Sequence, residues 1–327
     1  MWMVSRKLWI GAMLALLMIV LSACNSAGRE TNQSEAQFQP TANESGQQKQ
    51  TTRVIKTIKG DITIPAEPKR VIAQGYLGTF LALHVKPVGA PKWDIDSPHI
   101  KHLTAGIADI GQIEMGSVEK ILSLNPDLIV TLSDDPAMYE QLSKIAPTVV
   151  YPYNTFNDAR DEIKVFGELL GKQREAEAWI ADFNKTVQAA KEKIKGIVGK
   201  NETVSVMGEF NKEIYVYSFG IWRGVQAIYK HLELTPPPRV QKLIDAKEDL
   251  KVISYEMIPE FAGDYMFLEL GTSGQFQRHG AFWNSLEAVK NNRVFELDTD
   301  FFWPYDPIAI KAQVEKVAEM LEKSHKK

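Results

Sequence analysis

The feature that most constrains the fold of this chain is a segment that occurs twice, 137 residues apart and without a gap (Ser117 to Ser254). Both copies carry Ser, Glu, Ile and Asp at matching positions, and both end in an apolar run typical of a buried strand. A helix–strand unit that is used twice predicts two related lobes. Because ligands bind preferentially where domains meet, we expect a ligand cleft between the lobes.

Short apolar strands alternate with helices through the first half of the chain. Two alternating runs around Gly60 predict a β-hairpin. Continuous apolar runs such as Leu128–Leu132 are typical of a parallel sheet that is covered on both faces. This alternation predicts the α/β class. The expected strands lie at 70–74, 128–132 and 148–151, and the expected helices at 76–83, 118–124 and 138–145.

A long amphipathic helix separates the two copies of the repeat. Apolar residues recur at spacings of 4 and 3 from Ala176 to Ile197, which places them on one helix face. The predicted fold class is therefore α/β, with two Rossmann-like lobes joined by one long α-helix. The predicted boundaries are an N-terminal lobe at 53–171, a connecting helix at 172–198 and a C-terminal lobe at 199–327.

The N-terminus is typical of an exported protein. Arg6 and Lys7 precede an apolar run of 14 residues, which is shorter than the roughly 20 residues that span a membrane. The run ends in Leu-Ser-Ala-Cys, a string that resembles the bacterial lipobox, whose cysteine becomes the first mature residue and carries lipid. We expect a lipoprotein signal peptide at 1–23 and lipidation of Cys24. An ordinary signal peptide followed by a chance cysteine is the alternative.

The polar segment behind Cys24 is expected to be a disordered tether. Residues 25–52 contain no Leu, Ile, Val or Met, so they cannot bury enough apolar surface to offset the entropy of ordering. A lipid anchor and tether at 24–52 would hold the folded body at the extracytoplasmic face of the cell membrane.

Charge and cysteine content exclude several classes of protein. The 38 Lys and Arg against 41 Asp and Glu give a net charge of −3, so the chain lacks the basic excess of a nucleic-acid binder. The single cysteine excludes a disulfide framework and cysteine-rich metal sites. Of the six histidines only His99 and His102 are close in sequence, whereas capture of a free metal ion needs three or four ligands. A direct metal-binding lipoprotein is therefore disfavoured.

An anchored hydrolase is the alternative from another class. The sequence contains no G-x-S-x-G, no H-E-x-x-H and no G-x-x-x-x-G-K-[ST]. The string Gly271-Thr272-Ser273-Gly274 is one residue short of a nucleophile elbow. Nothing positive favours catalysis, so we expect a binding protein and not an enzyme.

Short strings in both lobes carry a resemblance to a known family. They are Pro-Lys-Arg-Val-Ile at 68–72, Val-Lys-Pro-Val-Gly-Ala at 85–90, Ser-Val-Glu at 117–119, Asn-Pro-Asp-Leu-Ile at 125–129 and Leu-Glu-Ala-Val-Lys-Asn-Asn-Arg-Val at 286–294. With the lipobox and the two lobes, they resemble the siderophore-binding lipoproteins of bacterial ABC importers, over about residues 53–322. The segments 259–265 and 302–307 look closest to the ferric-hydroxamate branch.

This resemblance implies a fold, a ligand and partners. The fold is the helical-backbone fold of periplasmic binding proteins. The ligand is a ferric siderophore, so the protein needs no resident cofactor and no metal ligands of its own. The partners are an ABC permease and its ATPase, and we expect the binding protein to be a monomer.

The two glutamates of the repeat acquire a role through the resemblance. In the family, one acidic residue on each lobe pairs with arginines of the permease, and Glu119 and Glu256 occupy the matching positions. Each exposed ion pair is worth only about 0–1 kcal/mol, so the effect should lie in orientation and encounter rate. Two solvated helix glutamates are the alternative.

The resemblance also implies a cationic cleft residue. Arg223, in Phe-Gly-Ile-Trp-Arg-Gly, resembles the cleft arginine of the family, and Trp222 stands where the family usually has Gly. Arginine suits an oxygen-rich chelate because its planar fork donates to neighbouring oxygens and stacks on rings. An exposed arginine with only a surface role is the alternative.

Four aromatic residues are expected to form the wall of the cleft. Trp303 and Tyr305 match the aromatic loop of the family, although the neighbouring phenylalanines would also suit a core segment. Tyr76 follows the strand at 71–74, and Trp93 lies on a loop after a strand-like segment, where binding residues are commonly found.

Another iron chelate remains an alternative ligand. Catecholate complexes carry about three negative charges and need several convergent cations, whereas Arg223 is the one cation that the sequence identifies. The sequence therefore favours a hydroxamate and leaves ferric citrate and catecholates as alternatives.

Overall fold

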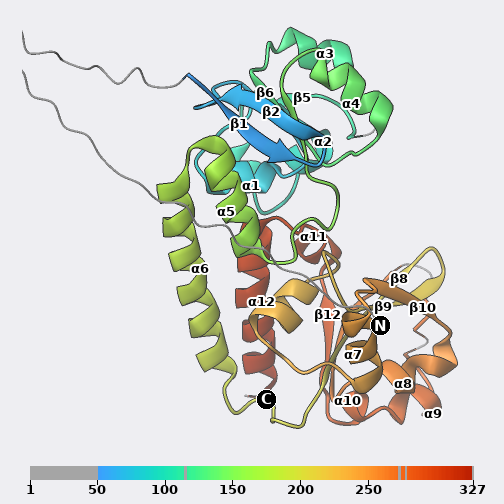
Figure 1. The fold of residues 1–327 in the computed structure, drawn as a ribbon. Coiled ribbons are helices and arrows are strands. Elements are labelled where there is room, and N and C mark those ends of the chain that lie inside the picture. Colours follow the sequence, from blue (N-terminus) through green and yellow to red (C-terminus); the bar gives the residue numbers. More distant parts are fainter. Residues whose placement is uncertain (1–50, 114–115, 272–273, 277, 326–327) are drawn as a thin grey trace, which may run out of the picture. The chain divides into compact units, whose positions relative to one another are not determined.

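The computed structural model describes residues 51–113, 116–271, 274–276 and 278–325 (Figure 1). They belong to one unit that spans Lys49–Lys327. The predicted signal peptide, Cys24 and nearly all of the predicted tether lie outside the described residues and stay predictions. Within these ranges, no helix is both long and apolar enough to cross a membrane.

The first lobe is built on a parallel sheet with the strand order β5-β4-β3-β6-β7. Its three longer strands are buried along their whole length, as the continuous apolar runs predict. A separate antiparallel hairpin precedes the sheet. Ile58 and Lys59 form its turn, and Gly60 follows with a φ of +95° that favours glycine. The strands are β1 (Thr52–Thr57), β2 (Gly60–Pro65), β3 (Val71–Gln74), β4 (Gly89–Ala90), β5 (Ala108–Asp109), β6 (Leu128–Thr131) and β7 (Thr148–Val150).

Side chains that accept backbone hydrogen bonds begin three of the helices of this lobe. Ser117, Asp135 and Asp158 each accept a bond from an amide of the first turn, which stabilises helix starts. The helical elements are α1 (Leu77–Ala82), α2 (Lys92–Ile95), η1 (Lys101–Leu103), α3 (Val118–Ser123), α4 (Pro136–Ser143) and α5 (Ala159–Leu170).

The long helix between the lobes is α6 (Gln173–Ile194). Its 22 residues correspond to a length of about 33 Å. It ends four residues before the predicted limit, because Lys195 takes extended backbone angles and Gly196 has a φ of +79°. Ile197, the last residue of the predicted stripe, therefore lies beyond the helix.

A second long helix, α12 (Pro307–His325), packs beside α6 (Figure 1). It follows the second lobe in the chain, yet it also contacts α1 and α5 of the first lobe. The sequence predicts one connecting helix, whereas two helices run along both lobes.

The second lobe contains a mixed sheet with the strand order β10-β9-β8-β11-β12. Strands β8, β11 and β12 are parallel, whereas β9 is antiparallel to both β8 and β10. The strands are β8 (Val204–Phe210), β9 (Glu213–Tyr217), β10 (Leu250–Ile253), β11 (Tyr265–Glu269) and β12 (Val294–Leu297). The other helical elements are η2 (Gln226–His231), α7 (Pro238–Asp245), η3 (Tyr255–Met257), α8 (Ile258–Phe261), α9 (Ala281–Asn284), α10 (Glu287–Lys290) and α11 (Thr299–Phe302).

The repeated aspartates have the same structural role in both lobes. Asp127 precedes β6, and its carboxylate accepts bonds of 2.7 and 2.9 Å from the amides of Lys69 and Arg70, just before β3. Asp264 precedes β11 and accepts a bond of 2.7 Å from the amide of Thr203, just before β8. Each aspartate thus holds the start of the neighbouring parallel strand, which explains why both copies of the repeat contain it.

Replacing Asp127 or Asp264 by alanine is expected to lower the free energy of unfolding by about 1–2 kcal/mol, because strand-start amides lose their acceptor. The loss should be larger at Asp264, whose bonds are partly buried. Urea unfolding measures the free energy of unfolding of both variants. The control is Asp134→Ala at an exposed loop position after β6, for which we expect a change within about 0.5 kcal/mol. Losses as small as that of the control would contradict the shared role.

Candidate functional site

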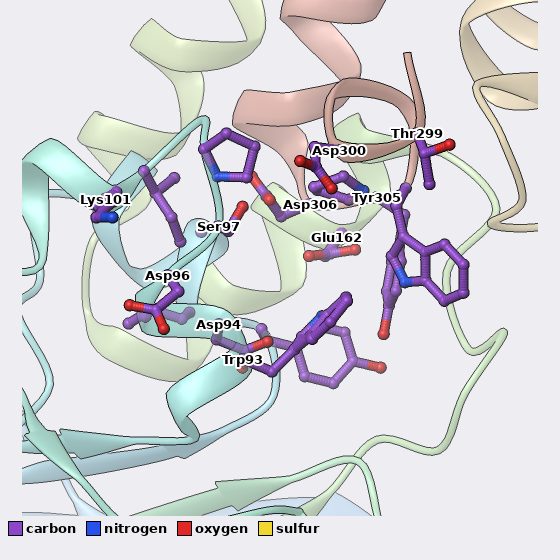
Figure 2. Close-up of a pocket in the computed structure, with 17 residues that line it drawn as sticks. Trp93, Asp94, Asp96, Ser97, Lys101, Glu162, Thr299, Asp300, Tyr305 and Asp306 are labelled. Carbon is purple, nitrogen blue, oxygen red and sulfur yellow. The ribbon is translucent and has the colours of Figure 1, made fainter. Parts of the chain in front are cut away.

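Residues of both lobes line a cavity of about 460 Å³ (Figure 2). The first lobe contributes the start of α1, α2 with the loop behind it, and Glu162 of α5. The second lobe contributes residues between 299 and 306, at α11 and the loop that leads into α12. The cavity therefore lies between the lobes, as the repeat predicts.

The four predicted aromatic residues all line this cavity. Trp93 and Trp303 come from opposite lobes, and their ring centroids lie 5.8 Å apart in an edge-on arrangement. Tyr76 precedes α1 and donates a hydrogen bond of 2.9 Å to the carbonyl oxygen of Tyr151. The structure places Trp93 in the short helix α2 and not on a loop, and its side chain is 58% exposed. A contact of these rings with a ligand stays a prediction.

Arg223 and Trp222 are not among the residues that line the cavity. Arg223 is buried, and its guanidinium lies 3.8 Å from the ring centroid of Trp303. Its Nε donates to the carboxylate of Glu269 at the end of β11, so its charge is paired. Trp222 is half-buried and donates a bond of 2.9 Å to Asp249. Arg223 is thus no surface residue: it supports Trp303 from outside the cavity, and direct contact with a ligand stays a prediction.

Two acidic residues that the sequence did not single out line the cavity, the buried Glu162 and the half-buried Asp306. Glu162 accepts a hydrogen bond from the hydroxyl of Thr79, and burial raises its pKa to about 8. Asp306 begins α12 and accepts bonds of 3.0 and 3.1 Å from the amides of Ile308 and Ala309. Burial raises the pKa of Asp306 as well. An aspartate directly before a proline at the start of an apolar helical run is a helix-start signal, whereas no sequence signal identifies Glu162.

A glycine allows α1 to approach Asp306. A Cβ atom on Gly78 would lie only 2.6 Å or less from three side-chain atoms of Asp306. The residue must therefore be glycine for α1 and the start of α12 to meet at the cavity wall.

A third acidic residue, Asp94, follows Trp93 in α2. Burial raises its pKa to about 7, and the negative charge of Asp306 adds to the rise. Its Oδ2 atom is buried and finds no hydrogen-bond partner in the part of the chain that the structure describes. The same holds for Oγ of Ser97, another residue of the cavity wall. Both atoms belong to residues of the cavity wall and are themselves shielded from solvent.

The two glutamates of the repeat lie outside the cavity, and both are exposed. Glu119, in the first turn of α3, accepts a bond of 3.2 Å from the hydroxyl of Ser117. Backbone hydrogen bonding and a bond from Ser254 lower the pKa of Glu256 in η3. Both carboxylates are thus accessible to a partner, and their role in docking stays a prediction.

Within the described ranges, no three His, Cys, Asp or Glu side chains are placed so that they could hold a metal ion. The described acidic residues of the cavity therefore do not form a metal site either. The expectation that iron arrives inside its chelator stays a prediction.

Comparison with known proteins settles the family. A family model described as periplasmic binding protein matches residues 71–301, which is more than half of the chain. The chain belongs to the periplasmic binding protein family. The resemblance that the sequence carries, and the two-lobed α/β fold with its long helix, are thereby confirmed.

The relatives of this periplasmic binding protein include proteins that handle iron complexes. The iron(3+)-hydroxamate-binding protein YxeB of Bacillus subtilis (strain 168) is 36% identical over 325 residues, 97% of each chain. The solved FhuD-fold component of a Fep/Fec-like ferrichrome ABC transporter from Bacillus subtilis has a TM-score of 0.74 and 38% identity, and the match covers 82% of this chain and 100% of that one. FhuD2 of Staphylococcus aureus with bound ferrioxamine B has a TM-score of 0.69 and 29% identity, over 79% of this chain and 99% of that one.

Proposed function

We propose that this periplasmic binding protein captures a ferric siderophore of the hydroxamate type in the cavity between its lobes and delivers it to an ABC permease for iron uptake. The observation that carries the proposal is the cavity itself, which both lobes line and to which four aromatic side chains contribute. Rings of this kind bury the apolar backbone of a chelate and leave its oxygens to a few polar groups. The hydroxamate and ferrichrome systems named for the relatives support this ligand class.

In this proposal the iron stays inside its chelator, and the protein supplies no ligand to the metal. Trp303 forms part of the wall, and Arg223 with its partner Glu269 holds that ring in place from behind. Because α6 and α12 both run along the lobes, closure on the ligand is small.

The proposal also includes a lipid anchor, a monomeric state without a resident cofactor, and the absence of catalysis. A lipid on Cys24 would keep the protein at the extracytoplasmic face of the membrane, which mass spectrometry of the membrane-bound protein tests. The protein would act as a monomer without resident cofactor, and it would bind its ligand without turning it over. A ferric siderophore that mass spectrometry recovers unchanged after incubation supports binding without turnover.

Titration of tryptophan fluorescence with ferrichrome, ferrioxamine B, ferric citrate and a ferric catecholate tests the ligand class. We expect the hydroxamates to bind at least about tenfold more tightly than the other two. Trp303→Ala should weaken hydroxamate binding by about 1–3 kcal/mol, because it removes a wall of the cavity, and Trp303→Phe should restore part of the loss.

The control is Phe210→Ala, an exposed aromatic residue of β8 outside the cavity wall, which should leave the affinity unchanged. Tightest binding of the catecholate would contradict the hydroxamate assignment. Failure of all four complexes to bind would contradict the proposed function.

A further inference from the structure

Two short segments, 97–101 of the first lobe and 299–303 of the second, meet at the cavity wall, and we call the place where they meet the seam. Residues of both segments line the cavity. His99 and Phe301, in the middle of the two segments, are not among the lining residues. The residues that do line it are Ser97, Pro98, Ile100 and Lys101 of the first segment and Thr299, Asp300 and Trp303 of the second (Figure 2).

A hydrogen bond crosses the seam. Nε2 of His99 lies 2.7 Å from the carbonyl oxygen of Phe301. Because a carbonyl oxygen can only accept, Nε2 carries the proton and donates it to this bond. The two rings also pack edge to face, with their centroids 4.5 Å apart. The pair therefore joins the two lobes directly behind the cavity wall.

The second segment of the seam is held firmly in its own lobe. Nε2 of Gln313, a buried residue of α12, donates to the carbonyl oxygens of Phe301 and Pro304 over 3.2 and 2.7 Å. The side chain of Phe301 packs against the core of the second lobe, and Phe302 belongs to that core. His99 thus ties the first segment to a fixed point.

The first segment of the seam is a short turn between α2 and η1. The amides of Ile100 and Lys101 both donate to the carbonyl oxygen of Ser97, over 3.1 and 2.8 Å, so these backbone bonds stay within the turn. Ile100 is buried, whereas Ser97 and His99 are half-buried and Pro98 is exposed. Partly exposed segments with local hydrogen bonds open at a lower free energy than the core does. The turn can therefore move while the rest of the lobe stays in place.

We propose that His99 is a positioning residue whose hydrogen bond to Phe301 keeps the seam closed, and that the siderophore enters and leaves the cavity through the seam when this bond opens. The inference rests on the proposed function, to which it adds the route of the ligand and the residue that sets the rate. This route requires no large rotation of the lobes, which α6 and α12 oppose.

Three variants of His99 separate its hydrogen bond from its ring contact. His99→Phe keeps a ring against Phe301 and removes the donor. His99→Gln removes the ring and supplies an amide N–H near the position of Nε2, whereas the amide of His99→Asn is too short to reach that position. The matched control is His102→Ala, which changes an exposed histidine of η1 outside the cavity wall.

Surface plasmon resonance on the immobilised protein measures the association and dissociation rates of ferrichrome and ferrioxamine B. Loss of one hydrogen bond shifts an opening equilibrium about three- to tenfold. Because the bond closes the seam of the free and the loaded protein alike, His99→Phe should raise both rates by this factor and change Kd less than about twofold. His99→Gln should return both rates to within about twofold of the wild type, and His102→Ala should leave them unchanged.

His99→Asn keeps the test open if His99→Phe fails to fold by circular dichroism, and it should raise both rates in the same way. Unchanged rates in these variants would overturn the route through the seam. Faster dissociation without faster association would reduce His99 to a support of the wall and overturn its control of entry.

The remaining outcomes concern the bond and the proposed function. Rates of His99→Gln that match those of His99→Phe would overturn the role of the hydrogen bond, and an equal rise in His102→Ala would overturn the assignment to His99. Failure of the wild-type protein to bind either siderophore would remove the proposed function together with the inference.

Discussion

Replacing Glu269 by alanine is expected to lower the free energy of unfolding by about 3–5 kcal/mol, because it leaves the buried charge of Arg223 without a counter-charge. Both side chains are at most 4% exposed, so water cannot take over from the carboxylate. Tyr217 would also lose the acceptor of its hydroxyl, which lies 3.3 Å from Oε2 of Glu269. Urea unfolding followed by circular dichroism measures the loss.

A double-mutant cycle separates this pair from its surroundings. Arg223→Ala alone should also destabilise the protein, and the variant that lacks both side chains should lose clearly less than the sum of the two single changes. Glu269→Gln keeps an acceptor of similar shape but removes the counter-charge of Arg223, so it should also destabilise the protein, by less than Glu269→Ala does. Additive losses, or a loss below about 0.5 kcal/mol for Glu269→Ala, would contradict the pairing.

The same variants test whether the Arg223–Glu269 pair affects siderophore binding. The guanidinium of Arg223 rests on Trp303, so loss of either partner should loosen that ring and weaken siderophore binding. Weakening by Glu269→Ala without any direct contact of Glu269 with the cavity would show that Arg223 acts by positioning Trp303.

Replacing Glu119 and Glu256 together by alanine is expected to reduce siderophore uptake by whole cells at least about tenfold and to leave the affinity of the purified protein unchanged. Both carboxylates are exposed and lie outside the cavity, so they are available to a partner and not to the ligand. Each single variant should retain part of the uptake, because one point of contact would remain. Uptake of radioactive iron and fluorescence titration give the two readouts.

Glu140→Ala is the matched control for this experiment. Glu140 is also an exposed helix glutamate of the first lobe, on α4, and it has no counterpart in the repeat. Its loss should leave uptake at the wild-type level. If the double variant lost siderophore affinity, or if uptake stayed normal, the assignment of the two glutamates to docking would be wrong.

The parts of the fold that follow from local patterns could be predicted from the sequence. The repeat indicated two lobes, and the continuous apolar run at Leu128–Leu132 indicated a buried parallel strand. The antiparallel strand β9 in the second lobe and the second long helix beside α6 were not predicted. Both depend on which elements pack together, and residue spacing along the chain does not record that choice.

The residues of the candidate site likewise fall into two groups, those that local sequence patterns indicate and those that only packing brings together. The four aromatic residues that the sequence singled out all line the cavity. The pair of Arg223 with Glu269 joins residues 46 positions apart, and no local signal marks it. Glu162 and Asp306 meet at one cavity only because α12 returns to pack against α1 and α5.

The position of α12 has a consequence for how cargo leaves the protein. Its N-terminal cap, Asp306, is part of the cavity wall, and its length contacts α6 and helices of the first lobe. Two long helices that pack along both lobes oppose a large rotation of one lobe against the other. If the proposed function is right, release of the ligand would depend on local movement of the cavity wall and not on a large rotation of one lobe, and we expect spontaneous dissociation of the siderophore to be slow.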